Sequence, residues 1–130
     1  MHDAMKKAEY SRIECFWALM HDASEAYLCD IARPVKNCLH GYLFYEENLM
    51  KCIAAKYNLS WPMPDIVKQM DLAMLATERF QLMGQPPIPW TSTEGAEPIP
   101  CKIEEWDWKS AKMEFLIRFG EYFGITQITA

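Results

Sequence analysis

The stretch of residues 15–30 constrains this chain more than any other. An apolar run leads directly into an adjacent His21-Asp22 pair, which is followed by Glu25 and Asp30. Four groups that can bind a metal or carry a proton therefore stand beside core-forming sequence. Burying a carboxylate costs several kcal/mol unless it is paired or bound to a metal. We therefore expect these polar groups to have a chemical role at the edge of a hydrophobic core.

The apolar residues that lead into this stretch recur with helical spacing. Four of them lie at positions i, i+3, i+4 and i+7, namely Ile13, Phe16, Trp17 and Met20. This pattern predicts a core-facing stripe on a helix over residues 4–20. If the helix continues without interruption, His21 and Glu25 lie one turn apart on the same face. Alternatively, a second helical segment begins near Ala23, because turns that bind metals often interrupt a helix.

The rest of the chain predicts three further helices, over residues 41–57, 65–83 and about 107–124. Residues that commonly begin or end helices stand at the ends of these segments. Proline suits a first helical turn, aspartate and serine cap N-termini, and glycine caps C-termini. The residues that we expect at these ends are Pro64, Gly84, Asp107 or Ser110, and Gly124.

Residues 84–105 contain most of the prolines and are expected to form a long surface loop of extended or polyproline character. Too little chain follows this loop to build a second core. No segment shows the convincing period-2 alternation of a strand. We therefore predict an all-α fold. It is a single domain over residues 1–130, a bundle of about four to five helices with a Pro-rich loop before the last one.

The composition excludes several classes of protein. The formal net charge is −5 and the basic residues form no stripe, so a partner of duplex nucleic acid is not expected. No apolar run reaches the roughly 18–20 residues that span a bilayer, and the polar N-terminus lacks the core of a signal peptide. We expect a cytoplasmic protein without a membrane partner. The five cysteines contain no CxxC motif and predict reduced, buried thiols.

The His-Asp pair offers one metal two ligands of different type, since imidazole suits transition metals and carboxylate also suits Mg²⁺ and Mn²⁺. A third ligand must come from a distant helix, and Asp71 is the candidate because it interrupts an apolar sequence. Glu25 can take a proton from a water or give one to a leaving oxygen. The alternatives are that His21 and Asp22 form a hydrogen-bonded pair at a helix end and that Asp71 is a satisfied polar group.

Two cations follow the acidic stretch. Arg33 and Lys36 flank Pro34, which breaks a helix at this point. Either side chain could bind the phosphate of a substrate near Asp30. The alternative is that both are solvated surface charges in a loop.

Three segments together resemble a known family. The first is HDASEAYLCDIARPVK at residues 21–36, and the others lie at residues 61–71 and 75–79. They are similar to the HD-superfamily metal-dependent phosphohydrolases, and most similar to the branch of bacterial 5′-deoxynucleotidases and phage dATP phosphohydrolases. The likeness extends over residues 10–124.

The resemblance implies an all-helical, HD-like fold and one divalent metal ion, which would be Mn, Co, Mg, Zn or Fe. Carried over by position, His21, Asp22 and Asp71 would be its ligands. Glu25 would be the catalytic acid/base or would position water, and Asp30 would act near the scissile phosphate. The implied substrate is a deoxynucleotide or a related small phosphate ester.

The chain departs from the family pattern in one respect. The family has a further ligand histidine on a helix upstream of the His-Asp pair, whereas only His2 precedes His21 here. Either the chain begins late and lacks the family's first helix, or His2 has been recruited as a ligand. We favour the first interpretation, because terminal residues usually fray. A missing helix would expose apolar surface, which a homodimer could cover.

Three hypotheses follow. The first is an HD-type phosphohydrolase that uses metal-activated water. The second is a degenerate HD-domain protein that binds a nucleotide or a protein partner without catalysis. The third is a structural helical module in which the His-Asp pair is only a local cap.

Overall fold

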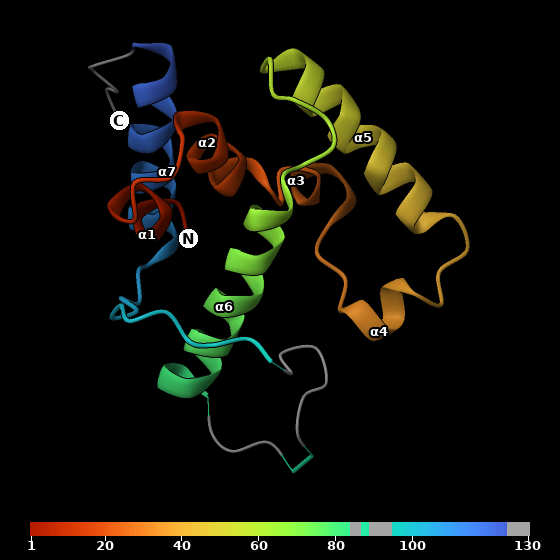
Figure 1. The fold of residues 1–130 in the computed structure, drawn as a ribbon. Coiled ribbons are helices and arrows are strands. Elements are labelled where there is room, and N and C mark those ends of the chain that lie inside the picture. Colours follow the sequence, from red (N-terminus) through yellow and green to blue (C-terminus); the bar gives the residue numbers. More distant parts are fainter. Residues whose placement is uncertain (84–86, 89–94, 125–130) are drawn as a thin grey trace. The chain divides into compact units, whose positions relative to one another are not determined.

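The fold is all-α, as predicted. The structure is a computed structural model that describes residues 1–83, 87–88 and 95–124, without the side chain of Arg33. Within these residues it contains helices and no strand. In chain order the helices are α1 (His2–Lys7), α2 (Arg12–Met20), α3 (Glu25–Leu28), α4 (Arg33–Lys36), α5 (Tyr42–Lys56), α6 (Asp65–Leu82) and α7 (Trp108–Phe123) (Figure 1). The described residues therefore hold more helices than the four to five predicted, because three of these helices are short.

The predicted helix over residues 4–20 is wrong, because the chain breaks between α1 and α2. Glu9 adopts a left-handed conformation with φ of 61°. The amides of Glu9 and Tyr10 donate to the carbonyls of Lys6 and Met5, at 3.2 Å each. A left-handed residue with these two hydrogen bonds is a Schellman motif, which ends a helix and satisfies its last carbonyls.

A capping box then starts α2. The Ser11 hydroxyl accepts from the Glu14 amide at 3.3 Å, and the Ser11 amide donates to the Glu14 carboxylate at 2.9 Å. Serine and a glutamate three residues later form this reciprocal pair at helix N-termini. The Ser-x-x-Glu signal is present in the sequence and marks the break that the apolar spacing conceals.

The bounds of the three long helices agree with the predictions. Asp107 caps α7 by accepting from the Ser110 amide at 2.7 Å, and Gly124 ends it with φ of 67°. Helix α5 ends in a second Schellman motif, in which Asn58 has φ of 55°. Pro64 directly precedes α6. The predicted cap at Gly84 lies outside the described residues.

The chain divides into two units, and each is described by itself. Unit 1 consists of Met1–Leu19 and Asp65–Ala130, and unit 2 consists of Met20–Pro64. The core of unit 1 includes the α2 side chains of Phe16 and Trp17, both buried. Phe16 stacks on Tyr122 of α7 with ring centroids 4.3 Å apart. Ile13, predicted to join this apolar stripe, is instead 55% exposed.

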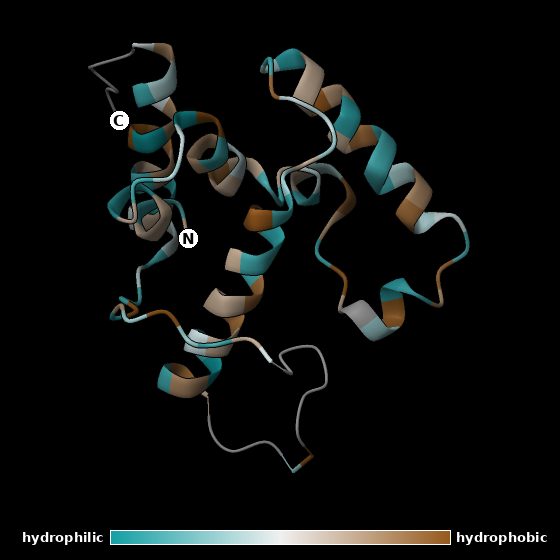
Figure 2. Cartoon of the chain, in the orientation of Figure 1, coloured by the Kyte–Doolittle hydropathy of each residue, from teal (hydrophilic) through white to brown (hydrophobic). Residues whose placement is uncertain are grey.

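Unit 2 holds α3, α4 and α5. The C-terminal half of α5 buries Met50, Ile53 and Ala54, whereas its first turn exposes Leu43 and Phe44. Figure 2 shows hydrophobic and hydrophilic residues interspersed along this helix. The prediction of buried cysteines is also wrong for three of the five, because the thiols at Cys29, Cys38 and Cys52 are exposed. All five cysteines are free, as predicted.

The described part of the Pro-rich segment, residues 87–88 and 95–107, contains neither helix nor strand. Residues 99–103 run along α6 and are called the strap below; Thr77 and Gln81 of α6 bind its backbone. Among the described residues, no helix is long and apolar enough to cross a membrane.

Candidate functional site

The candidate site begins where α2 ends. Residues 21–24 form turns, in which the Ala23 amide donates to the Met20 carbonyl at 3.0 Å and the Glu25 amide to the Asp22 carbonyl at 2.9 Å. Helix α3 starts only at Glu25. His21 and Glu25 are therefore not on one continuous helix, and the alternative of a second helical segment is confirmed, with its start at residue 25.

His21 and Asp22 form a direct pair. The imidazole Nε2 lies 2.8 Å from a carboxylate oxygen of Asp22. The side chain of His21 is 20% exposed and that of Asp22 is 59% exposed, so the pair lies at the surface rather than in the core. A nitrogen and an oxygen donor side by side are of the types that divalent metals bind. As placed, the imidazole nitrogen of His21 and the carboxylate of Asp22 lie within hydrogen-bonding distance of each other.

The surroundings of Glu25 raise the pKa of its carboxyl group. Burial raises its pKa, and the negative charges of Asp22, Asp30 and Glu46 raise it further, while Lys36 acts in the opposite direction. A carboxyl group with a raised pKa holds its proton more readily near neutral pH, which suits a general acid or base. The structure thus brings together Glu25 with the two aspartates that the sequence singled out.

Lys36 is part of a half-buried ion pair. Its ammonium lies 2.7 Å from a carboxylate oxygen of Glu46, and the two side chains are 17% and 20% exposed. Burial disfavours the charge on Lys36, but the hydrogen bond to Glu46 and the negative charges around the ammonium together outweigh burial, and the pKa of Lys36 is raised. The same ammonium lies 5.4 Å from the ring centroid of Tyr42. Lys36 is therefore a fixed positive charge and not a solvated one.

Glu46 and Tyr42 are two members of this cluster that sequence reasoning missed. Both lie on α5, and the Tyr42 hydroxyl donates to the carbonyls of Leu28 and Cys29 at 3.3 and 2.8 Å. These bonds tie the end of α3 to the start of α5. No local spacing links residues 28, 36 and 46, so only the tertiary structure could reveal the connection.

The other predicted metal ligands belong to unit 1. Asp71 lies on α6 and is partly buried. His2 lies on α1, where it is 5% exposed and not frayed. Its Nδ1 lies 2.8 Å from Asp3 Oδ1 and its Nε2 lies 2.8 Å from the Tyr122 hydroxyl. Both ring nitrogens of His2 therefore already have protein partners.

Asp30 and Arg33 complete the set of predicted residues. Asp30 is exposed, and its charge acts on Glu25. The backbone of Arg33 begins α4, but its side chain lies outside the described residues. Within the described part of the chain, no group of three or more His, Cys, Asp or Glu side chains is arranged to hold a metal. The imidazole nitrogen of His21 and the carboxylate oxygens of Asp22 are atoms of the types that a divalent metal binds, and the two side chains pair with each other.

Comparison with known proteins gives one relative. The chain is 46% identical over 80 residues to "Uncharacterized protein YfdR" of Escherichia coli strain K12. The matched region makes up 62% of this chain and 45% of that protein, so the chain spans about half the length of the curated relative that it matches. No family model matches the chain. No solved structure matches it either.

Proposed function

We propose that this chain is a metal-dependent phosphohydrolase of the HD type that acts on deoxynucleotides or related small phosphate esters. The observation that carries the proposal is the pairing of His21 with Asp22 beside Glu25, whose pKa is raised. Side chains that can ligate a metal, next to a carboxyl group that can accept or give a proton, suit the hydrolysis of an ester by water. The sequence resemblance supplies the reaction class.

Each residue of the proposed site has its own role in the hydrolysis. His21 and Asp22 would hold a divalent ion, with Asp71 as the further ligand that the resemblance implies. The ion supplies Lewis acidity at the phosphoryl group and lowers the pKa of water. Glu25 takes the proton as the water oxygen bonds to phosphorus and the ester bond breaks. Asp30 assists proton transfer to the leaving oxygen.

Positive charge near this cluster supports a phosphorylated substrate. Lys36 is held in place by Glu46, and its positive charge acts to lower the pKa of Glu25. A fixed ammonium attracts a phosphate as a point charge. Arg33, one helical turn before it, is the second cation proposed to bind substrate.

The second candidate is an HD-like domain that binds a nucleotide or a protein partner without catalysis. One observation favours it: both ring nitrogens of His2 already bond within the protein, which leaves neither for a metal. Under this hypothesis the cluster recognises a ligand without the full set of metal ligands.

The two candidates are tested on metal-stripped, folded protein by calorimetric titration with Mn²⁺, Co²⁺, Mg²⁺ and Zn²⁺. Phosphate release from a panel of deoxynucleoside mono- and triphosphates is then measured with each metal. His21→Ala should abolish metal binding and turnover. His40→Ala is the matched control, because His40 is exposed and lies outside the cluster, and it should change neither. Glu25→Gln should retain the metal but lower the rate roughly 100-fold or more.

The outcomes separate the hypotheses. Turnover that depends on His21 and Glu25 supports the hydrolase. Nucleotide binding without phosphate release, at any metal, supports the non-catalytic domain. If folded protein binds neither metal nor nucleotide, both candidates fail and the His-Asp pair is only a local cap.

A further inference from the structure

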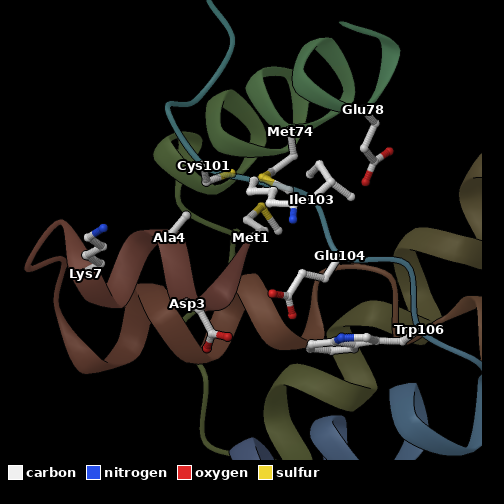
Figure 3. A pocket seen from close by; sticks show the side chains of 11 residues that line it. Met1, Asp3, Ala4, Lys7, Met74, Glu78, Cys101, Ile103, Glu104 and Trp106 are labelled. Atoms are coloured by element: carbon white, nitrogen blue, oxygen red, sulfur yellow. The ribbon is translucent and has the colours of Figure 1, made fainter. Parts of the chain in front are cut away.

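Unit 1 has an open hollow between α1, α6 and residues 101–106 (Figure 3). Its charged lining contains lysines and glutamates alike, namely Lys7, Lys102, Glu78 and Glu104. The carboxylate of Asp3, which also lines it, already pairs with Arg118. Neither sign of charge prevails there, so the hollow favours no particular ligand. The contacts around Tyr42 in unit 2 are more specific.

The backbone of Cys29 has a conformation that residues with a side chain rarely adopt. At the end of α3 its φ is 54° and its ψ is 155°. These angles lie close to the region that glycine alone adopts readily. Such a conformation persists only where the surrounding structure holds it, and it is frequent at functional sites. Cys29 directly precedes Asp30, so its conformation sets the direction in which Asp30 leaves α3.

Tyr42 holds this turn from the first position of α5. Its hydroxyl donates to the Cys29 carbonyl at 2.8 Å, and the Leu28 carbonyl lies 3.3 Å away. Burial raises the pKa of Tyr42, so its hydroxyl keeps the proton that it donates. A hydrogen bond to the strained residue offsets part of the cost of its conformation. The bond therefore stabilises the turn that directs Asp30.

The ring of Tyr42 also contacts the cation of the proposed site. The Lys36 ammonium lies 5.4 Å from the centroid of this ring and 2.7 Å from a carboxylate oxygen of Glu46. A tyrosine ring attracts a cation through its quadrupole. Tyr42 and Glu46 are one turn apart on α5, so both can reach Lys36 from one face of this helix. The hydroxyl and the ring of Tyr42 thus serve two different residues of the site.

We infer that Tyr42 is a positioning residue of the proposed hydrolase site. Its hydroxyl fixes the Cys29 turn that directs Asp30, and its ring helps to hold the ammonium of Lys36. The inference rests on the proposed function, because Asp30 and Lys36 have their roles only there. Tyr42 itself touches neither the water nor the phosphate in this role. Small displacements of a reacting group lower the rate strongly, so loss of the hydroxyl should act on catalysis.

The inference is tested by kinetics of the full chain, with the metal and the deoxynucleotide that the wild-type protein hydrolyses fastest. Tyr42→Phe removes the hydroxyl and keeps the ring. It should lower kcat about tenfold and change KM less than about twofold. Tyr42→Leu removes the ring as well and should also raise KM about two- to threefold. Tyr45→Phe and Tyr45→Leu are the matched controls on the same helix, because Tyr45 is 63% exposed, and they should change neither constant.

A second substitution tests the link between Tyr42 and the strained turn. Glycine adopts a positive φ without the cost that a side chain brings. Cys29→Gly should therefore restore most of the kcat that Tyr42→Phe loses. Cys38→Gly is the control in the same background, because Cys38 is also exposed and is not among the residues with a positive φ. It should restore nothing.

The conformation of the turn is measured directly by nuclear magnetic resonance. The nuclear Overhauser effect between the amide proton and the Hα of one residue is strong at positive φ, because the two protons are then close. For Cys29 it should be strong in the wild-type protein and in Tyr45→Phe, and weaker in Tyr42→Phe.

The outcomes distinguish a failure of this inference from a failure of the proposed function. If the wild-type protein turns over but Tyr42→Phe keeps its kcat, the inference is wrong and the hydrolase stands. The same holds if Tyr45→Phe loses as much, if Cys38→Gly restores activity equally, or if the Cys29 signal is unchanged in Tyr42→Phe. If the folded wild-type protein hydrolyses no substrate with any metal, the hydrolase proposal fails and this role of Tyr42 fails with it.

Discussion

Two His-Asp dipeptides occur in this chain, and their surroundings give them different roles. In both, an imidazole nitrogen lies 2.8 Å from the adjacent carboxylate. His2 is 5% exposed, and its second nitrogen meets Tyr122. His21 is 20% exposed and stands beside the acidic cluster of Glu25. The first pair thus fastens α1 to α7, whereas the second has the accessibility that a site requires.

Asp3 predicts a pH dependence of stability at the residue scale. Its hydrogen bond with Arg118 holds the pKa of this carboxyl well below its usual range. A carboxyl pKa lowered by folding adds stability above the unfolded value of about 3.9, and this stability is lost as the pH falls below it. Asp3→Asn should therefore lower the free energy of unfolding by about 1 kcal/mol at pH 7, since exposure screens the pair. Urea denaturation at pH 7 and pH 3 measures this difference.

Two comparisons check this prediction. The gap between wild type and Asp3→Asn should shrink as the pH falls from 4 to 3. Glu105→Gln removes an exposed carboxylate, and it should change the free energy of unfolding little at either pH. A gap that stays constant or widens in acid would contradict the role assigned to Asp3.

At the scale of elements, α6 uses polar side chains to hold a segment that has no secondary structure. Thr77 donates to the Ala73 carbonyl at 2.7 Å within its own helix and accepts from the strap at Ile99. Gln81, one turn further, pairs with the strap twice. The strap backbone thereby obtains partners that a strand would find in a sheet.

Gln81→Ala tests this contact. Loss of both side-chain hydrogen bonds should free the strap, so amide hydrogen exchange at Ile103 should accelerate about fivefold or more, at about 1 kcal/mol for the lost bonds. Gln69→Ala is the matched control on the same helix, because Gln69 is exposed and has no bond to the strap. Unchanged exchange at Ile103 in Gln81→Ala would mean that other contacts hold the strap.

At the scale of the whole molecule, the two units differ in how much they bury. The largest fully buried side chains are Trp17, Met5, Val67 and Thr77, and all belong to unit 1. Unit 2 exposes several large apolar side chains, among them Tyr27, Phe44 and Tyr45. Because apolar burial is the main source of stability, the two units should not be equally stable.

Native-state hydrogen exchange should report this difference. Amides in the middle of α2 and α6 should exchange about tenfold or more slowly than those in the middle of α5. Trp17→Ala should lower the free energy of unfolding by about 3–5 kcal/mol, the cost of a large cavity. In the Trp17→Ala variant, protection of amides from hydrogen exchange should be lost in α2 before it is lost in the other helices. Equal protection in α5 and α2 of the wild-type protein would show that the molecule opens as one cooperative unit.

Local chemistry made the three long helices predictable. The ends of α5, α6 and α7 follow from residues such as Pro64, Asp107 and Gly124, whose effects reach only one turn. The Ser11–Glu14 capping box is a local signal of the same kind. The apolar spacing of residues 13–20 predicts one continuous helix and conceals the break before α2, which the capping box marks.

The sequence by itself determined that the chain is helical and that His21, Asp22, Glu25 and Asp30 follow one another within ten residues, since these features depend on neighbours a few residues apart. Only the tertiary structure decided which side chains are buried or paired. Ile13 is exposed, His2 bonds to Tyr122, and Lys36 pairs with Glu46. Contacts between residues 10 to 120 positions apart depend on how helices pack, and packing leaves no periodic trace in the sequence.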